Sequence, residues 1–163
     1  MAYGHLKSLV YLMKTHTLLP FFLGLILSAY SLSTLAVDPV YTGGSARAAI
    51  KGYDTVAYFT QGEAVKGTEE FSYKYLGATW WFSSEAHRKL FIASPEKYAP
   101  QYGGYCAYAV SRNTTASIKP KVFDIHEGKL YLNYNKGVQK RWLKNKTERI
   151  ENADDNWPKL LDN

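Results

Sequence analysis

Two stretches of the chain alternate hydrophobic and polar residues with the two-residue period of a β-strand. The first lies within residues 71–82 and is interrupted by the pair Leu76-Gly77, and the second lies within residues 122–134 and is interrupted by Glu127-Gly128. Two such runs around a short glycine-containing pair are typical of an antiparallel hairpin. The pattern therefore predicts two hairpins, and one face of the first is almost entirely aromatic.

Helical spacing of apolar residues follows each hairpin. Residues 83–92 are predicted to form a helix, because the serine and glutamate side chains at residues 83–85 suit a helix N-terminus. Pro95 suits the first position of a second short helix. Residues 136–157 keep the helical period up to Pro158, where we expect the helix to end. The apolar, β-branched run 54–59 predicts a further strand. Together these elements predict an α+β fold with two antiparallel hairpins and several short helices.

Composition indicates one domain with an aromatic core. The chain has 163 residues, of which 15% are Phe, Trp or Tyr, and it carries a single cysteine. Each aromatic side chain can bury about 150–250 Å², so a chain of this size can form a core without disulfides. We expect a single domain over residues 51–163, preceded by an extended lead-in at residues 37–50.

The first 36 residues have the features of a secretory signal. Lys7 and Lys14 precede the apolar run 18–30, and residues 34–36 supply small side chains at the two positions that a signal peptidase reads. The apolar run is interrupted and falls short of the about 20 residues of a membrane span. We therefore expect residues 1–36 to be removed and the protein to be periplasmic or secreted, with no stable membrane span after cleavage. An uncleaved anchor is the alternative.

The charge pattern argues against nucleic acid as a partner. The chain has 20 basic and 14 acidic residues, a formal net charge of +6. The excess is concentrated in residues 136–149, and acidic residues follow directly behind it. Such a run is typical of the solvated face of a helix, and no base-reading motif accompanies it. We therefore predict no nucleic-acid binding.

Cys106, the only cysteine, lies in the glycine- and tyrosine-rich stretch 101–110. A lone thiol in an oxidising compartment cannot form an intramolecular disulfide, so it is either a buried small hydrophobe or a reactive or metal-binding group. His87 and His126 are the only histidines beyond residue 36. One cysteine and two histidines cannot make a closed zinc site of four Cys and His ligands within one chain.

Four segments give the chain a resemblance to a known family. They are residues 52–59 (GYDTVAYF), 77–84 (GATWWFSS), 94–100 (SPEKYAP) and 102–110 (YGGYCAYAV). With these segments, residues 52–110 resemble a YHS domain. The chain beyond residue 36 is similar to the secreted, stand-alone YHS-domain proteins, some of which carry selenocysteine at the position of Cys106. The resemblance therefore implies chemistry at this thiol.

The resemblance also implies a metal, because YHS domains of metal-transport ATPases are associated with heavy-metal binding through cysteines. This chain departs from that pattern, since it has Ala57, Ser83 and His87 at the corresponding positions. Methyl and hydroxyl groups do not replace thiolates as ligands of Cu(I) or Zn²⁺. A multi-thiolate site is therefore not expected there, and only His87 keeps a ligand-type side chain.

Three hypotheses for function follow. In the first, the protein is a soft-metal-binding module in which Cys106 holds an ion such as Cu(I) with His87 or His126, received from a metal-donor protein. In the second, Cys106 is the nucleophile of a thiol-dependent redox protein, and a redox partner supplies the second thiol. In the third, Cys106 is packed in the core and the domain is a non-catalytic interaction or structural module.

A pocket around Cys106 is expected to include Tyr53, Asp54 and Tyr105. The first two stand at the start of the region that resembles a YHS domain. The alternative for Asp54 is a turn or helix-cap role, and the alternative for Tyr53 is packing in the core.

Overall fold

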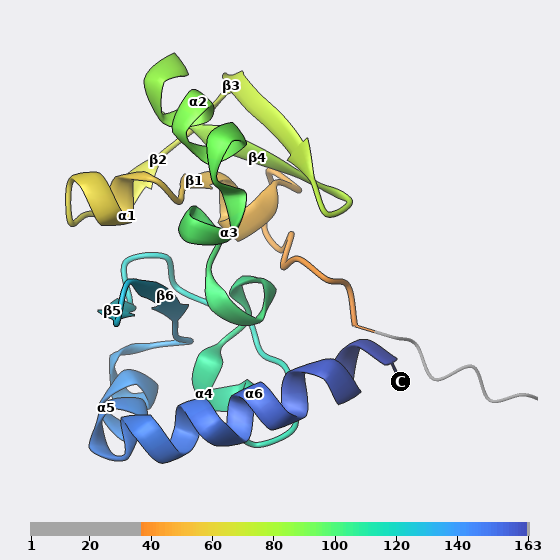
Figure 1. Ribbon diagram of the computed structural model, residues 1–163, viewed down its shortest axis with the longest axis vertical. Helices are drawn as coiled ribbons and strands as arrows, with labels where there is room; N and C mark the ends of the chain where they lie inside the picture. Colours follow the sequence, from red (N-terminus) through yellow and green to blue (C-terminus); the bar gives the residue numbers. More distant parts are fainter. Residues whose placement is uncertain (1–36, 163) are drawn as a thin grey trace, which may run out of the picture. The chain divides into compact units, whose positions relative to one another are not determined.

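The computed structural model describes residues 37–162, and the predicted signal segment lies outside the described residues (Figure 1). Within the described part, the chain has the predicted α+β fold, built from three two-stranded antiparallel sheets, six α-helices and two 3-10 segments. The strands are β1 (Tyr53–Asp54), β2 (Val65–Lys66), β3 (Thr68–Tyr75), β4 (Ala78–Phe82), β5 (Phe123–His126) and β6 (Lys129–Leu132). The helical elements are η1 (Ala49–Gly52), α1 (Ala57–Thr60), α2 (Glu85–Ala93), α3 (Pro95–Tyr98), η2 (Gln101–Gly104), α4 (Ala107–Val110), α5 (Lys136–Lys144) and α6 (Lys146–Asp162).

The first predicted hairpin is confirmed as β3 and β4. Tyr73 lies opposite Trp80, and burial alternates along β4 as expected for a strand with one face on the core. Leu76 and Gly77 form the turn with φ angles of 48° and 75°. Two consecutive positive φ angles match the tight type I′ turn, whose twist suits the flanking strands.

The second predicted hairpin is confirmed as β5 and β6. Phe123 lies opposite Leu132, and the chain turns at Glu127-Gly128, again with positive φ at both residues. Cys106 forms an isolated parallel bridge to Leu132. This bridge joins the cysteine-containing segment to the second hairpin.

The predicted strand over residues 54–59 is wrong. Only Tyr53–Asp54 is extended, where β1 pairs with the unpredicted strand β2, and α1 begins at Ala57. The carboxylate of Asp54 accepts hydrogen bonds from the backbone N–H groups of Val56 (2.9 Å) and Ala57 (3.3 Å). This side chain satisfies two donors at the helix start, so the local turn outweighs the β-propensity of the run.

The expected helix end before Pro158 is also wrong, because α6 continues through Pro158 to Asp162. Proline removes one backbone donor and crowds the preceding turn. Beyond it, Leu160 is buried, and its carbonyl accepts a hydrogen bond from the backbone N–H of Val37 (3.3 Å). These tertiary contacts hold the last turn, and α6 lies alongside α4 (Figure 1).

Two clusters of buried side chains form the core. The larger includes Trp80, Phe82 and Phe91, and the smaller includes Tyr131 and Trp142. The lead-in contributes buried side chains as well, and the backbone N–H of its Tyr41 donates to the carbonyl of Gly103 (2.9 Å). Among the described helices, none is both long enough and apolar enough to cross a membrane.

Candidate functional site

Asp54 is the centre of a buried polar network. Its side chain has no exposed surface, and both carboxylate oxygens accept hydrogen bonds. Oδ1 accepts from the two N–H groups at the start of α1. Oδ2 accepts from the backbone N–H of Ser83 (2.9 Å), from Ser83 Oγ (2.6 Å) and from Nδ1 of His87 (2.6 Å). This number of donors offsets the cost of removing the carboxylate from water.

His87 lies in the first turn of α2, which begins as predicted at a serine cap: the backbone N–H of His87 donates to Ser84 Oγ (3.2 Å). Its Nδ1 faces Asp54, and its Nε2 lies 3.3 Å from Thr60 Oγ1. The side chain is 12% exposed. Nδ1 therefore donates to the carboxylate, and Nε2 is left to meet Thr60 or a ligand.

The side chains of Asp54, His87 and Thr60 follow one another in the order of a catalytic triad, with Thr60 Oγ1 3.3 Å from Nε2 of His87. The hydroxyl of Thr60 donates to the carbonyl of Val56 (3.1 Å). The single hydroxyl proton of Thr60 therefore has two acceptors within reach, the Val56 carbonyl and the imidazole of His87. The arrangement is suited to holding α1 against α2.

Ala57, Ser83 and His87, the positions at which the resemblance to YHS domains places cysteines, meet at Asp54. The backbone N–H of Ala57, the N–H and hydroxyl of Ser83 and the imidazole of His87 all donate to its carboxylate. Within residues 37–162, no group of three or more His, Cys, Asp or Glu side chains could hold a metal ion. The donors present therefore do not fit a thiolate metal site, and a carboxylate organises the same positions instead.

Cys106 lies in the core. It is 1% exposed, its Sγ is 3.8 Å from Oδ1 of Asn133, and its backbone N–H donates to Ala116. Asn133 is also fully buried, and its Nδ2 has no partner within the described residues. The sulfur is a weak donor to the amide oxygen, which is the behaviour of a packed thiol.

Of the predicted site residues, the structure brings together Asp54 and His87. The others have different neighbours: His126 lies 3.9 Å from the Glu127 carboxylate, the Lys66 ammonium is 4.7 Å from the Tyr53 ring, and the Tyr105 ring packs against Tyr41 and Trp157. The sequence did not predict the contact between Asp54 and His87, because the two residues lie far apart in the chain and belong to no common motif.

A groove of about 480 Å³ is the second candidate site. It is lined by residues of the lead-in, the β3–β4 turn, the segment from α3 to η2, and the end of α6: Pro39, Val40, Tyr75, Leu76, Trp80, Glu96, Ala99, Pro100, Gln101, Tyr102, Gly103, Asp154, Trp157, Pro158 and Leu161. Most of these side chains are apolar or aromatic. The aromatic face of the first hairpin was the one sign of this groove in the sequence.

Comparison with known proteins identifies one domain. Residues 56–102 match the YHS domain family. The chain therefore contains a YHS domain, as the resemblance predicted. The match includes His87, whereas Asp54 and Cys106 lie just outside its two ends. No curated protein and no solved structure matches the chain.

Proposed function

We propose that the protein is a non-catalytic binding module, in which the apolar groove holds the ligand and Cys106 belongs to the core. The groove carries this proposal. Its volume of about 480 Å³ falls within the roughly 300–1,000 Å³ of small-molecule sites, which are mostly apolar with a few polar groups. Cys106, in contrast, is 1% exposed.

Leu76 supports the proposal because it lines the groove at a turn position where a large apolar residue is unfavourable. It is 56% exposed and has a φ of 48° in the β3–β4 turn. Asparagine is strongly preferred at this position of a type I′ turn, and a large apolar residue there is unfavourable both for the backbone and for solvation. Residues that contradict their local environment gather at functional sites. Leu76 therefore fits a role in ligand contact.

Leu76→Asn is expected to weaken groove binding without weakening the fold. We expect about a fivefold higher Kd for N-phenyl-1-naphthylamine, a neutral apolar fluorophore, because one apolar wall is lost. Stability to urea should be unchanged or raised by up to about 1 kcal/mol, because asparagine tolerates positive φ. Fluorescence titration and urea unfolding measure the two effects.

Glu127→Asn is the matched control. Glu127 has a φ of 50° at the corresponding position of the β5–β6 turn, and it does not line the groove. Its substitution should leave the Kd of the fluorophore unchanged. The proposal fails if the wild-type protein does not bind the fluorophore, or if both variants bind it as tightly as wild type.

The soft-metal and thiol-redox hypotheses both require access to Cys106. Cys106 is only 1% exposed in the native fold. We therefore expect its thiol to react with Ellman's reagent at least about a hundredfold more slowly in the native protein than in urea-unfolded protein. Comparable rates would favour the redox hypothesis. Competition for Cu(I) with a chromogenic chelator tests the metal hypothesis, which fails if wild-type and Cys106→Ala proteins have equal affinity.

Export of the protein, and its place among the secreted YHS-domain proteins, are part of the proposal. They are supported by the charged, apolar and small-residue order of residues 1–36. Sequencing the N-terminus of the protein recovered from its native cell should give Val37 as the first residue. A product that retains residues 1–36 would favour the uncleaved anchor.

A further inference from the structure

The charged residues of the groove are all acidic. Among the described residues that line it, Glu96 and Asp154 are the only charged ones, and no lysine, arginine or histidine joins them. The chain as a whole is basic, with a net charge of +6. The groove therefore has the opposite charge to the protein that contains it.

Glu96 and Asp154 are both exposed to solvent, and within residues 37–162 neither forms an ion pair. Within residues 37–162, the ion pairs involve other acidic residues, at positions 54, 85, 124 and 127. The ammonium of Lys97, which follows Glu96 in the chain, is 5.0 Å from the centre of the Tyr98 ring, and Lys97 does not line the groove. Two solvent-exposed carboxylates beside an apolar surface therefore have no ion-pair partner among the described residues.

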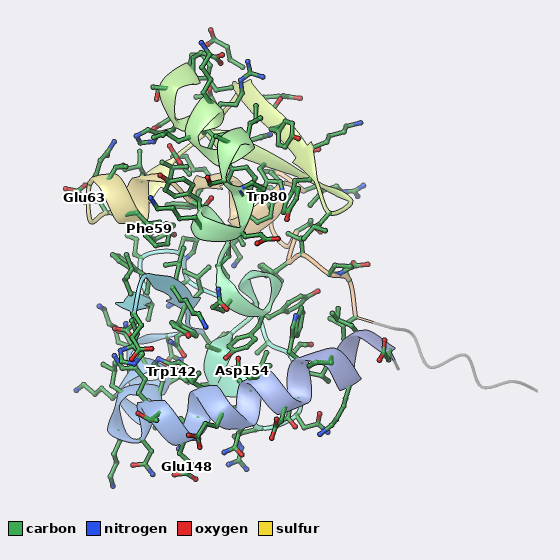
Figure 2. The ribbon with its side chains drawn as sticks, in the orientation of Figure 1. Phe59, Glu63, Trp80, Trp142, Glu148 and Asp154 are labelled. Carbon is green, nitrogen blue, oxygen red and sulfur yellow. The ribbon has the colours of Figure 1, made fainter. Side chains whose placement is uncertain are left out.

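Asp154 is held in place by Tyr102. The Tyr102 hydroxyl donates to Asp154 Oδ1 (2.8 Å), which leaves Oδ2 for another donor. Burial, together with this hydrogen bond, raises the pKa of Tyr102, so the hydroxyl keeps its proton and its donor role at neutral pH. Figure 2 shows Asp154 on the inner side of α6, whereas Glu148 points away from the domain.

Aromatic rings complete the lining. Tyr75, Trp80, Tyr102 and Trp157 line the groove. Trp80 and Tyr102 are only 2% and 5% exposed, so the half-buried rings of Tyr75 and Trp157 offer most of the aromatic surface. Tyr102 and Trp157 meet edge to face with their ring centres 6.3 Å apart. Aromatic faces and carboxylates both attract an ammonium group, while the apolar surface favours a hydrocarbon body. An anionic ligand would meet two negative charges and no cation.

We propose that the ligand of the groove is an organic cation, with an ammonium group that faces Glu96 and Asp154 and an apolar body that covers the aromatic wall. This inference rests on the proposed function, because it specifies the ligand of the same groove. In this proposal the apolar lining residues supply contact area for the ligand, and the two carboxylates favour a positively charged ligand over a neutral or negative one.

Three ligands with the same eight-carbon chain test the inference: octylammonium, octanol and octanoate. Each is titrated against wild-type protein by displacement of N-phenyl-1-naphthylamine at moderate ionic strength. We expect octylammonium to bind about tenfold more tightly than octanol, with octanoate weaker than both. High salt should reduce the advantage of the ammonium, because salt screens exposed charges.

Glu96→Gln and Asp154→Asn keep the shape of each side chain and remove its charge, and asparagine still offers an acceptor to Tyr102. Each variant should reduce the octylammonium advantage to about threefold, and the double variant should abolish it, with octanol affinity unchanged throughout. Asp155→Asn is the control, because Asp155 is exposed on α6 and does not line the groove.

The two proposals fail in different ways. If octanol displaces the fluorophore as well as octylammonium does, or if the advantage of octylammonium persists in the double variant, the inference of a cationic ligand is overturned while the groove stays a binding site. If neither the fluorophore nor octanol binds, the proposed function fails, and the inference fails with it.

Discussion

Replacement of Asp54 by alanine is expected to lower the free energy of unfolding by about 3–5 kcal/mol. The carboxylate is fully buried and accepts hydrogen bonds from two N–H groups of α1, from Ser83 and from His87. Its removal leaves these donors in the interior without an acceptor, and each buried donor left unpaired costs about 1–3 kcal/mol. Urea denaturation followed by tryptophan fluorescence measures the loss.

Two further variants make the Asp54 result specific. Asp54→Asn keeps the volume but directs an amide N–H₂ toward some of the donors, so a smaller loss of about 2–3 kcal/mol is expected, and this variant stays measurable if Asp54→Ala does not fold. Asp155→Ala replaces an exposed aspartate and should change stability by less than about 0.5 kcal/mol. If Asp54→Ala behaved like Asp155→Ala, the carboxylate would have no structural role.

Gly103→Ala is expected to lower the free energy of unfolding by about 2–4 kcal/mol. Gly103 has a φ of 57°, and a Cβ there would overlap the carbonyl oxygen of Pro39. The obstacle is backbone, so the lead-in must move away. That movement breaks the hydrogen bond from the Tyr41 N–H to Gly103 and exposes Val40, which is 2% exposed in the native fold.

Gly62→Ala is the control for Gly103→Ala. It measures the cost of placing alanine at a positive φ without the overlap with Pro39. Gly62 has a φ of 71°, and nothing lies within 4 Å of the position where its Cβ would be. Only the left-handed conformation then opposes alanine, which costs about 1–2 kcal/mol. Equal losses in the two variants would show that the approach of Pro39 to Gly103 is unimportant. Because Pro39 and Val40 also line the groove, Gly103→Ala should in addition weaken binding of N-phenyl-1-naphthylamine.

Both hairpins were predictable because their signals are local. Alternating apolar residues define the strands, and a pair ending in glycine, Leu76-Gly77 or Glu127-Gly128, defines each turn. The start of α2 was predictable for the same reason, since Ser84 caps the helix only three residues from the N–H that it binds. Elements whose determinants lie within a few residues need no information from the rest of the chain.

Two elements failed the prediction for different reasons. Residues 54–59 have strand-like side chains, but the Asp54 carboxylate accepts from the N–H groups of Val56 and Ala57, so a local turn starts α1, and distant contacts to Ser83 and His87 hold that carboxylate in place. Pro158 is a sound local signal for the end of a helix, yet α6 continues because Leu160 is buried and bonds to the lead-in. Tertiary contacts of a few kcal/mol exceed the local preferences that they oppose.

The sequence by itself determined the α+β class, the two hairpins and the presence of a YHS domain, because each depends on residue type and short spacing. Only the tertiary structure decided that Asp54 meets His87, that Cys106 is buried beside Asn133, and that Glu96 and Asp154 share one aromatic groove. These pairs are joined through the packing of separate elements around a common core. No period or motif in the chain records which distant side chains that packing brings together.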